Sequence, residues 1–189
     1  MIILASASPR RKELIRLITE DFKIIPSNAD ENISGEYSPQ ELTKQLSKIK
    51  AIDVFNKVKN NSDIIVSADT VVSIDNKVLG KPKDENDAFQ TLKLLSGNVH
   101  SVYTGVTIMK GDYIDIFSEK TDVYFYPLTD DDIKEYLKNN EYKDKAGAYG
   151  IQGFGGLFVE KIVGDYNNVV GLPVSKLNIK LKSLGLNTD

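Results

Sequence analysis

Three arginines stand close together near the start of a chain that otherwise uses lysine as its cation. Arg10, Arg11 and Arg16 are the only arginines among 24 basic residues. The planar fork of an arginine holds two phosphate oxygens at once, which a lysine ammonium cannot do. The cluster therefore indicates a phosphate site, and chance clustering on a solvated helix is the alternative.

The arginine pair falls where acidic residues are expected. Ser8-Pro9 begins a predicted helix, so Arg10 and Arg11 lie in its first turn, near the positive end of the helix dipole. Three other predicted helices have acidic first turns instead: those after Ser38, Asp84 and Thr129. Each misplaced cation costs about 0.3–1 kcal/mol, and the cost reverses when an anion binds the free N–H groups and the hydroxyls of Ser6 and Ser8. We predict a cradle for a di- or triphosphate; a surface pair offset by Glu13 is the alternative.

One carboxylate and two lysines could complete such a site. Asp69 interrupts the apolar run from Ile64 to Val72, so its side chain needs a partner, and it could activate water, hold a metal or cap a turn. Lys50 lies four residues after Leu46 on a predicted helix, so it either reaches the edge of the core or points into a cleft. Lys81 lies in a Gly-Lys-Pro turn that could present its ammonium group.

Glycines concentrate in residues 147–171, which hold seven of the 13 in the chain. The segment has no phosphate-loop pattern and does not open the first strand–helix unit, so it is not a dinucleotide fingerprint. Its backbone freedom could allow close approach to a base or ribose. Gln152 carries both a donor and an acceptor, which suits the edge of a base; an exposed glutamine in a tight bend is the alternative.

The elements that position these residues alternate along the chain. We expect strands at Ile2–Ala5, Phe22–Pro26, Ile64–Val72, Val99–Met109 and Tyr113–Tyr126. We expect helices from Ser8, from Ser38, over Asp84–Leu95, over Thr129–Leu137 and over Val174–Leu184. The second helix should turn one side to the core, with Leu42, Leu46, Ile49 and Ile52. This alternation predicts an α/β fold with a mixed sheet.

Composition excludes several classes of protein. Without cysteine there is no disulfide, thiolate zinc site or cysteine nucleophile, and a single histidine, His100, argues against a catalytic triad. A net charge of −3 gives no broad surface for nucleic acid. No apolar stretch has membrane-spanning length, and we see no secretory signal at the start. We therefore expect a cytoplasmic protein.

Taken together, these motifs resemble the Maf family of nucleoside triphosphate pyrophosphatases. The matching stretches span nearly the whole chain in order: Leu4–Arg11, Lys50-Ala51, Ala68–Val72, Gly80–Pro82, Leu95–Gly97 with His100, Asp144–Gly153, Gly164–Tyr166 and Gly171–Pro173. The resemblance implies one domain over residues 1–189, with a central mixed, twisted sheet flanked by helices and two lobes with a cleft between them.

The resemblance also implies hydrolysis between the α and β phosphates with Mg²⁺ or Mn²⁺. It assigns Asp69 as the proton acceptor for the attacking water. It places phosphate-binding side chains at Ser6, Arg10, Arg11, Lys50 and Lys81. As carboxylates for the metal we take Asp69 and, second, Glu31.

Three positions separate two branches of the family. The branch acting on 7-methyl-GTP typically has tryptophan, glutamine and glutamate where this chain has Arg10, Thr70 and Gln152. The residues present resemble the dTTP/UTP branch. A glutamine can donate to and accept from the N3–H and carbonyls of uracil or thymine, whereas a glutamate only accepts. Losing the tryptophan also removes a stacking surface for a methylated purine.

We therefore predict a dTTP/UTP pyrophosphatase whose partner is the nucleotide, with neither nucleic acid nor membrane; a homodimer is left open. The family includes proteins linked to septum formation in bacteria, so roles in house-cleaning and cell division are open as well. A pyrophosphatase for modified or purine nucleotides is one alternative. A nucleotide-binding division regulator without catalysis is another.

Overall fold

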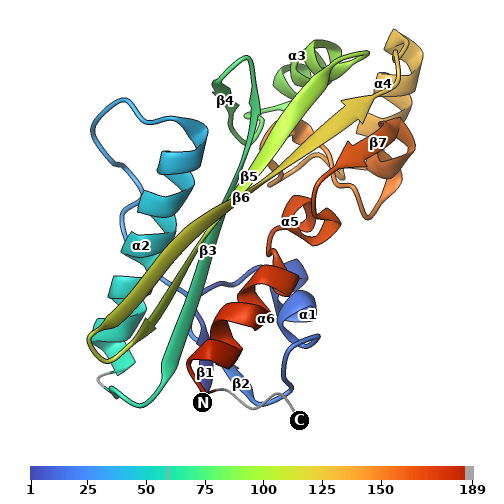
Figure 1. Ribbon diagram of the computed structural model, residues 1–189. Coiled ribbons are helices and arrows are strands. Elements are labelled where there is room, and N and C mark those ends of the chain that lie inside the picture. Colours follow the sequence, from blue (N-terminus) through green and yellow to red (C-terminus); the bar gives the residue numbers. More distant parts are fainter. Residues whose placement is uncertain (59, 186–189) are drawn as a thin grey trace.

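The computed structural model describes residues 1–58 and 60–185, and in this part of the chain seven strands form one mixed sheet. The order is β2-β1-β3-β5-β6-β7, and β4 pairs with β3 (Figure 1). β1 runs parallel to β2 and β3, and the other pairs are antiparallel. The predicted α/β fold with a mixed sheet is confirmed.

The strands are β1 (Ile2–Leu4), β2 (Phe22–Ile24), β3 (Ile64–Ile74), β4 (Lys77–Leu79), β5 (Val99–Lys110), β6 (Tyr113–Phe125) and β7 (Val159–Val163). The helices are α1 (Pro9–Ile15), α2 (Pro39–Val58), α3 (Glu85–Leu95), α4 (Asp130–Leu137), α5 (Tyr166–Val170) and α6 (Val174–Ser183). Two short 3₁₀ turns, η1 (Ala146–Ala148) and η2 (Phe154–Phe158), lie in the glycine-rich segment. Each α-helix in the described residues is too short or too polar to cross a bilayer.

The capping residues begin their helices as predicted. The side chains of Ser8, Asp84 and Thr129 accept hydrogen bonds from the first turns of α1, α3 and α4. Thr129 and Asp132 form a complete capping box, which satisfies two otherwise unpaired backbone donors. The sequence therefore sets these three helix starts locally.

The buried face of α2 differs from the prediction. Ile52 is 38% exposed, and the residues that face the sheet are mostly small: Thr43, Leu46, Ser47, Ala51 and Val54. The reason lies in β5, where a Cβ added to Gly105 would meet the carbonyl group of Thr43 at 2.3 Å. Because the helix backbone lies this close to the strand, small and hydroxyl side chains fit at the contact and large aliphatic ones do not.

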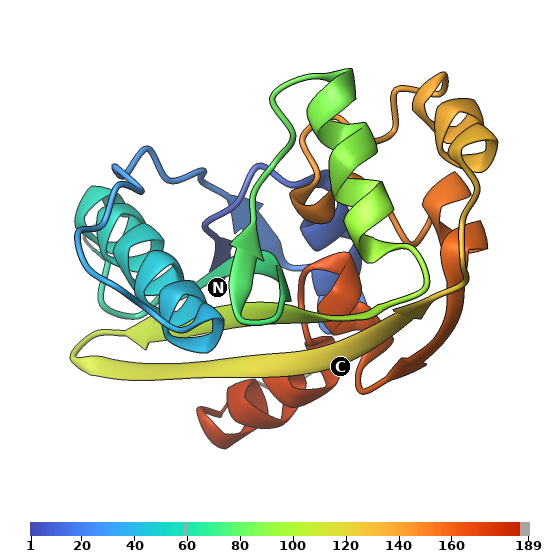
Figure 2. The ribbon, with the colours of Figure 1, turned by 90° about the horizontal axis from the view of Figure 1, so that it is seen from above.

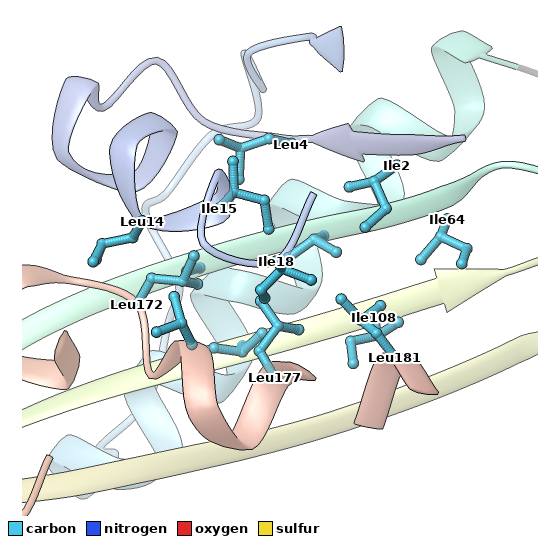
Figure 3. Close-up of a cluster of buried hydrophobic side chains, with 14 of the residues drawn as sticks. Ile2, Leu4, Leu14, Ile15, Ile18, Ile64, Ile108, Leu172, Leu177 and Leu181 are labelled. Carbon is cyan, nitrogen blue, oxygen red and sulfur yellow. The ribbon is translucent and has the colours of Figure 1, made fainter. Parts of the chain in front are cut away.

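The described residues form two lobes that share the sheet, as Figures 1 and 2 show. In one lobe, α1 and α6 cover β1, β3 and β5 with a cluster of buried aliphatic side chains (Figure 3). In the other, α3, α4 and the glycine-rich segment enclose a cluster rich in aromatic rings. The long strands β5 and β6 run through both, and each fully buried leucine, such as Leu177, adds about 1.5–3 kcal/mol.

One edge of β3 is open in the middle. β5 pairs with β3 over Ile65–Ser73 and so occupies one edge. On the other edge, β1 pairs up to Val66 and β4 begins at Val72. Between these two residues, no strand in the described part of the chain covers that edge. This gap exposes the segment that contains Asp69 and Thr70.

Candidate active site

A cleft of about 950 Å³ lies against the open edge of β3, between the two lobes. Its walls come from the start of α1, the loop after β2, α2, the turn after β4, the glycine-rich segment and the end of α5. The predicted site residues all line this one cleft: Ser6, Arg10, Arg11, Glu31, Lys50, Asp69, Thr70, Lys81 and Gln152. Residues up to 146 positions apart in sequence are thus brought together.

An ion-paired triad stands at the floor of the cleft. Lys50 Nζ lies 2.6 Å from Asp69 Oδ1 and 3.1 Å from Glu31 Oε2. The side chains of Lys50 and Asp69 are 13% and 12% exposed, whereas that of Glu31 is 56% exposed. Lys50 therefore points into the cleft. Asp69 Oδ2 accepts no hydrogen bond from the described residues, which leaves this oxygen for a water molecule.

The close packing of α2 explains why Lys50 reaches Asp69. Asp69 pairs with Gly105 across the β3–β5 ladder, and Gly105 is where the backbone of α2 approaches the sheet. Side chains alternate along a strand, so Asp69 turns towards α2 and Thr70 towards α1. Both side chains still reach the cleft because the edge of β3 is open over the segment that contains them, between Val66 and Val72.

Arg11 is held by three acceptors. Its Nε donates to the Gly171 carbonyl at 2.8 Å, one Nη to Ser6 Oγ at 3.3 Å and the other to Thr70 Oγ1 at 3.0 Å. Burial lowers the pKa of the Arg11 guanidinium, and the nearby Asp69 carboxylate opposes that shift. A five-donor guanidinium keeps two N–H groups after these bonds, one on each Nη.

The helix start offers fewer backbone donors than predicted. The N–H of Ser8 donates to Ser6 Oγ at 3.2 Å, and the N–H of Arg11 donates to Ser8 Oγ at 3.4 Å. Pro9 has no N–H, and α1 is only seven residues long. The free N–H groups that the sequence suggested are thus largely used by local capping, and the positive character of this wall comes mainly from the arginine side chains.

The opposite wall carries a lysine that the sequence analysis did not single out. Lys145 lines the cleft beside Lys81, and its ammonium donates to the Glu141 carbonyl. Burial lowers the pKa of Lys145, and Arg10 acts in the same direction, so the two cations lie within range of each other's charge. Lys81 is 66% exposed and 3.9 Å from Asp144, which is a loose surface pair.

Glu141 fixes the glycine-rich segment that carries Gln152. Its two carboxylate oxygens accept from the N–H groups of Phe154 at 3.2 Å and Gly155 at 3.1 Å. A Cβ on Gly153 would meet Glu141 Oε1 at 1.5 Å, so a larger residue there would displace the carboxylate that holds this segment. Gln152 is exposed at the mouth of the cleft. The segment is therefore a braced wall, and Glu141 escaped notice because an acidic residue after a helix has no distinctive pattern.

The single histidine lies behind this wall. His100 is 1% exposed, and its Nε2 lies 2.7 Å from the hydroxyl of Tyr149, which lines the cleft. Burial lowers the pKa of His100 to about 4. A neutral ring packed edge-on against Phe125 and Tyr149 anchors the segment from within.

A divalent metal would find two carboxylates here. The described residues contain no group of three or more histidine, cysteine or acidic side chains suited to a metal. The ammonium of Lys50, however, already occupies a cation position between Asp69 and Glu31. Mg²⁺ is commonly held by one or two carboxylates together with substrate phosphates and water, so this pair fits such an ion.

Comparison with known proteins identifies the family. The model of the Maf-like protein family matches residues 1–184. This chain belongs to the Maf family. Among curated Maf relatives, the chain is similar to the dTTP/UTP pyrophosphatase of Carboxydothermus hydrogenoformans, with 52% identity over 97% of this chain and 98% of the relative.

Two further relatives bear the same name. The dTTP/UTP pyrophosphatase of Clostridium botulinum is 50% identical over 96% of this chain and 97% of its own length. That of Thermococcus gammatolerans is 49% identical over 98% of this chain and 97% of its own length. By structure, this Maf protein is similar to the Staphylococcus aureus Ham1 protein at a TM-score of 0.49, with 11% identity over 66% of this chain and 71% of that chain.

Proposed function

We propose that this Maf protein hydrolyses dTTP and UTP to the nucleoside monophosphate and pyrophosphate. Relatives at about 50% identity over nearly the whole chain bear that activity in their names. The observation that carries the proposal is the composition of the cleft, where cations from both lobes line the same cavity as the mostly buried carboxylate of Asp69. Cleavage of a triphosphate needs cations for its charge and a group that positions water.

The phosphate tail binds along the cationic walls in this proposal. Arg10, Arg11 and Lys50 belong to one lobe and Lys81 to the other, so a triphosphate between them is held from both sides. The hydroxyl of Ser6 lies beside Arg11 and can add a hydrogen bond to the same phosphate. These charges oppose the negative charge that develops on the departing pyrophosphate.

Asp69 then acts as the proton acceptor. Its Oδ2 takes the proton of a water molecule as the water oxygen attacks the α-phosphorus from the side opposite the leaving group. A new bond joins the water oxygen to the α-phosphorus, and the bond from this phosphorus to the α–β bridging oxygen breaks. Pyrophosphate leaves with the bridging oxygen, and Lys50 moves from Asp69 to a phosphate oxygen so that the carboxylate is free to act.

Asp69 and Glu31 are the residues that would hold Mg²⁺ or Mn²⁺ in this proposal. When bound, such an ion supplies Lewis-acid polarisation of the phosphate oxygens. Because the described residues contain no group of three or more side chains that could hold a metal together, the remaining ligands would be phosphate oxygens and water. Metal affinity should therefore be weak without nucleotide and tighter with it.

Gln152, Arg10 and Thr70 carry the preference for the base. The exposed amide of Gln152 at the mouth of the cleft can accept from N3–H and donate to a carbonyl of uracil or thymine. Arg10 stands where a tryptophan would favour a methylated purine. UTP and dTTP share the same base edge, which is why one glutamine serves both.

Phosphorus NMR of the reaction with UTP tests the proposal, followed by turnover of UTP, dTTP, CTP, ITP and 7-methyl-GTP. We expect UMP and pyrophosphate, with UTP and dTTP as the best substrates. Release of orthophosphate would indicate a phosphatase, and an unchanged spectrum would indicate a binding protein. Preference for ITP or 7-methyl-GTP would refute the assignment of the base.

We also propose that residues 1–189 form one domain, since β5 and β6 run through both lobes. The last four of these residues lie outside the described part of the chain. A cytoplasmic location stays a prediction, and a homodimer and a link to cell division stay open.

A further inference from the structure

The orientation of Arg11 is fixed before any substrate arrives. Three of its five N–H groups are bonded to Gly171, Ser6 and Thr70 at 2.8–3.3 Å. The N–H groups left for a phosphate are one on each Nη, and their directions follow from those three bonds. Whatever holds the three acceptors therefore sets how the guanidinium meets the substrate.

The acceptor at Thr70 is itself held by a chain of hydroxyl groups with a defined direction. Thr104 Oγ1 donates to the Asn168 carbonyl at 3.0 Å, which uses its only hydrogen. In the 2.8 Å contact between Thr70 and Thr104, the donor must then be Thr70. The hydrogen of Thr70 is thus committed to Thr104, and its oxygen is left to accept from Arg11.

Asn168 anchors this chain and the second acceptor together. Its side chain is fully buried and donates to the Val102 carbonyl and to Thr121 Oγ1, both at 3.0 Å. The backbone carbonyl of Asn168 accepts from Thr104 Oγ1 and also from the N–H of Gly171 at 3.1 Å. One backbone carbonyl therefore links both the hydroxyl chain and the residue that binds Arg11 Nε.

The backbone conformation that lets the Gly171 carbonyl bind Arg11 favours glycine at this position. Its φ is 128°, a conformation that residues with a side chain rarely adopt. This turn after α5 aims the Gly171 carbonyl at Arg11. The register of β3 and β5 places Thr70 opposite Thr104, so the hydroxyl chain crosses the sheet at one pair of residues.

We propose that Thr104 and Asn168 are positioning residues that act through Thr70 and Gly171 to hold Arg11 in its phosphate-binding orientation. Neither of them lines the cleft. The inference rests on the proposed triphosphate hydrolysis, and it adds to the proposed part of Thr70 in base preference a role in orienting the Arg11 guanidinium. Loss of the Thr104 hydroxyl frees Thr70 to rotate and leaves the Asn168 carbonyl without one of its donors.

The test compares Thr104→Val with Thr104→Ser. Valine keeps the shape without the hydroxyl, and serine keeps the hydroxyl. Because small misplacements of a catalytic cation are costly, we expect kcat/KM for UTP to fall ~10–100-fold in Thr104→Val and to stay within about twofold in Thr104→Ser. Thr107→Val is the matched control, since this fully buried threonine of the same strand bonds Ser47 Oγ at 2.9 Å on the other face. It should lose similar stability and keep wild-type turnover.

A double-mutant cycle separates positioning from a general structural effect. If Thr104 acts through Arg11, Thr104→Val should cause little further loss in an Arg11→Lys background. An equal loss in both backgrounds, wild-type kinetics in Thr104→Val, or a loss in Thr104→Ser as large as in Thr104→Val would each overturn the proposal. If Thr104→Val does not fold, Thr70→Val breaks the same chain and should show the same non-additivity with Arg11→Lys.

The proposed function and this inference can fail separately. If the wild-type protein hydrolyses no nucleotide, the proposed function is wrong. The same variants are then compared by their affinity for inorganic pyrophosphate in titration calorimetry. A weaker affinity in Thr104→Val that serine restores would support the positioning role, and equal affinities would refute it.

Discussion

Replacing the carboxylate of Asp69 by an amide isolates its chemistry from its shape. Asn has the same size, and its amide oxygen can still accept from Lys50 Nζ, which lies 2.6 Å from Asp69 Oδ1. Lys50 also keeps Glu31 at 3.1 Å as a partner for its charge. The fold and the cationic walls of the cleft should therefore survive in Asp69→Asn, and the proton acceptor should not.

The expected magnitude follows from the role of a general base. Such a group contributes about 10²–10⁴-fold to the rate, so kcat for UTP should fall by that factor. Weakening a charge-assisted hydrogen bond should lower the free energy of unfolding by about 1–3 kcal/mol. Binding of UTP should be retained or slightly tightened, because one negative charge leaves a site that binds a polyanion.

Asp115→Asn is the matched control. Asp115 pairs with Lys180 at 2.7 Å and its side chain is 22% exposed, so the same chemical change is made on a similar ion pair that lies outside the cleft. Pyrophosphate release, UTP affinity by calorimetry and urea unfolding are measured for both variants. The reasoning fails if Asp69→Asn keeps wild-type turnover, or if its loss of kcat is no larger than that of Asp115→Asn.

Three further predictions concern Lys50, Gly105 and His100. Lys50→Met should bind Mn²⁺ more tightly than the wild type in electron paramagnetic resonance titrations without nucleotide, because no ammonium group then competes for the carboxylates of Asp69 and Glu31. Its UTP turnover should fall. Equal Mn²⁺ affinities would contradict the idea that the metal and the Lys50 ammonium occupy the same position. In Gly105→Ala, the new Cβ would meet Thr43 at 2.3 Å and move α2 together with Lys50. The variant should therefore lose about 1–3 kcal/mol of stability in urea unfolding, and its UTP turnover should fall. A variant with wild-type stability would argue against that close contact. Because burial lowers the pKa of His100 from 6.5 to about 4, the unfolded state binds the extra proton between these values. The contribution of His100 to the free energy of unfolding is thus complete above pH 6.5 and falls by about 3 kcal/mol as the pH drops to 4. His100→Gln should lack this part of the pH dependence in urea unfolding, and an unchanged profile would show that the ring is not buried in its neutral form.

The sequence identified the walls of the site because their residues break local rules. Arg10 and Arg11 stand in a first turn where acidic residues belong, and Asp69 interrupts an apolar strand. Such exceptions can be recognised in the amino-acid sequence alone, and all three residues line the cleft. The spacing of Lys50 to Leu46 left two positions open, the edge of the core or a cleft, and the structure shows that Lys50 lines the cleft.

The sequence did not identify the residues that hold these walls. Glu141, Thr104 and Asn168 act through backbone groups distant in the chain, and no local pattern marks them. The strands β4 and β7 escaped prediction because they are short and partly exposed. The apolar stripe of α2 was misassigned since the close contact at Gly105 selects small side chains, which a search for large aliphatic residues overlooks.

The central claim is that water oriented by Asp69 attacks the α-phosphorus of a triphosphate held in the cleft. Hydrolysis of UTP in ¹⁸O-labelled water, followed by phosphorus NMR, tests it directly. The account predicts an isotope-shifted signal for UMP and an unshifted signal for pyrophosphate. A label in pyrophosphate, or release of orthophosphate, would contradict it.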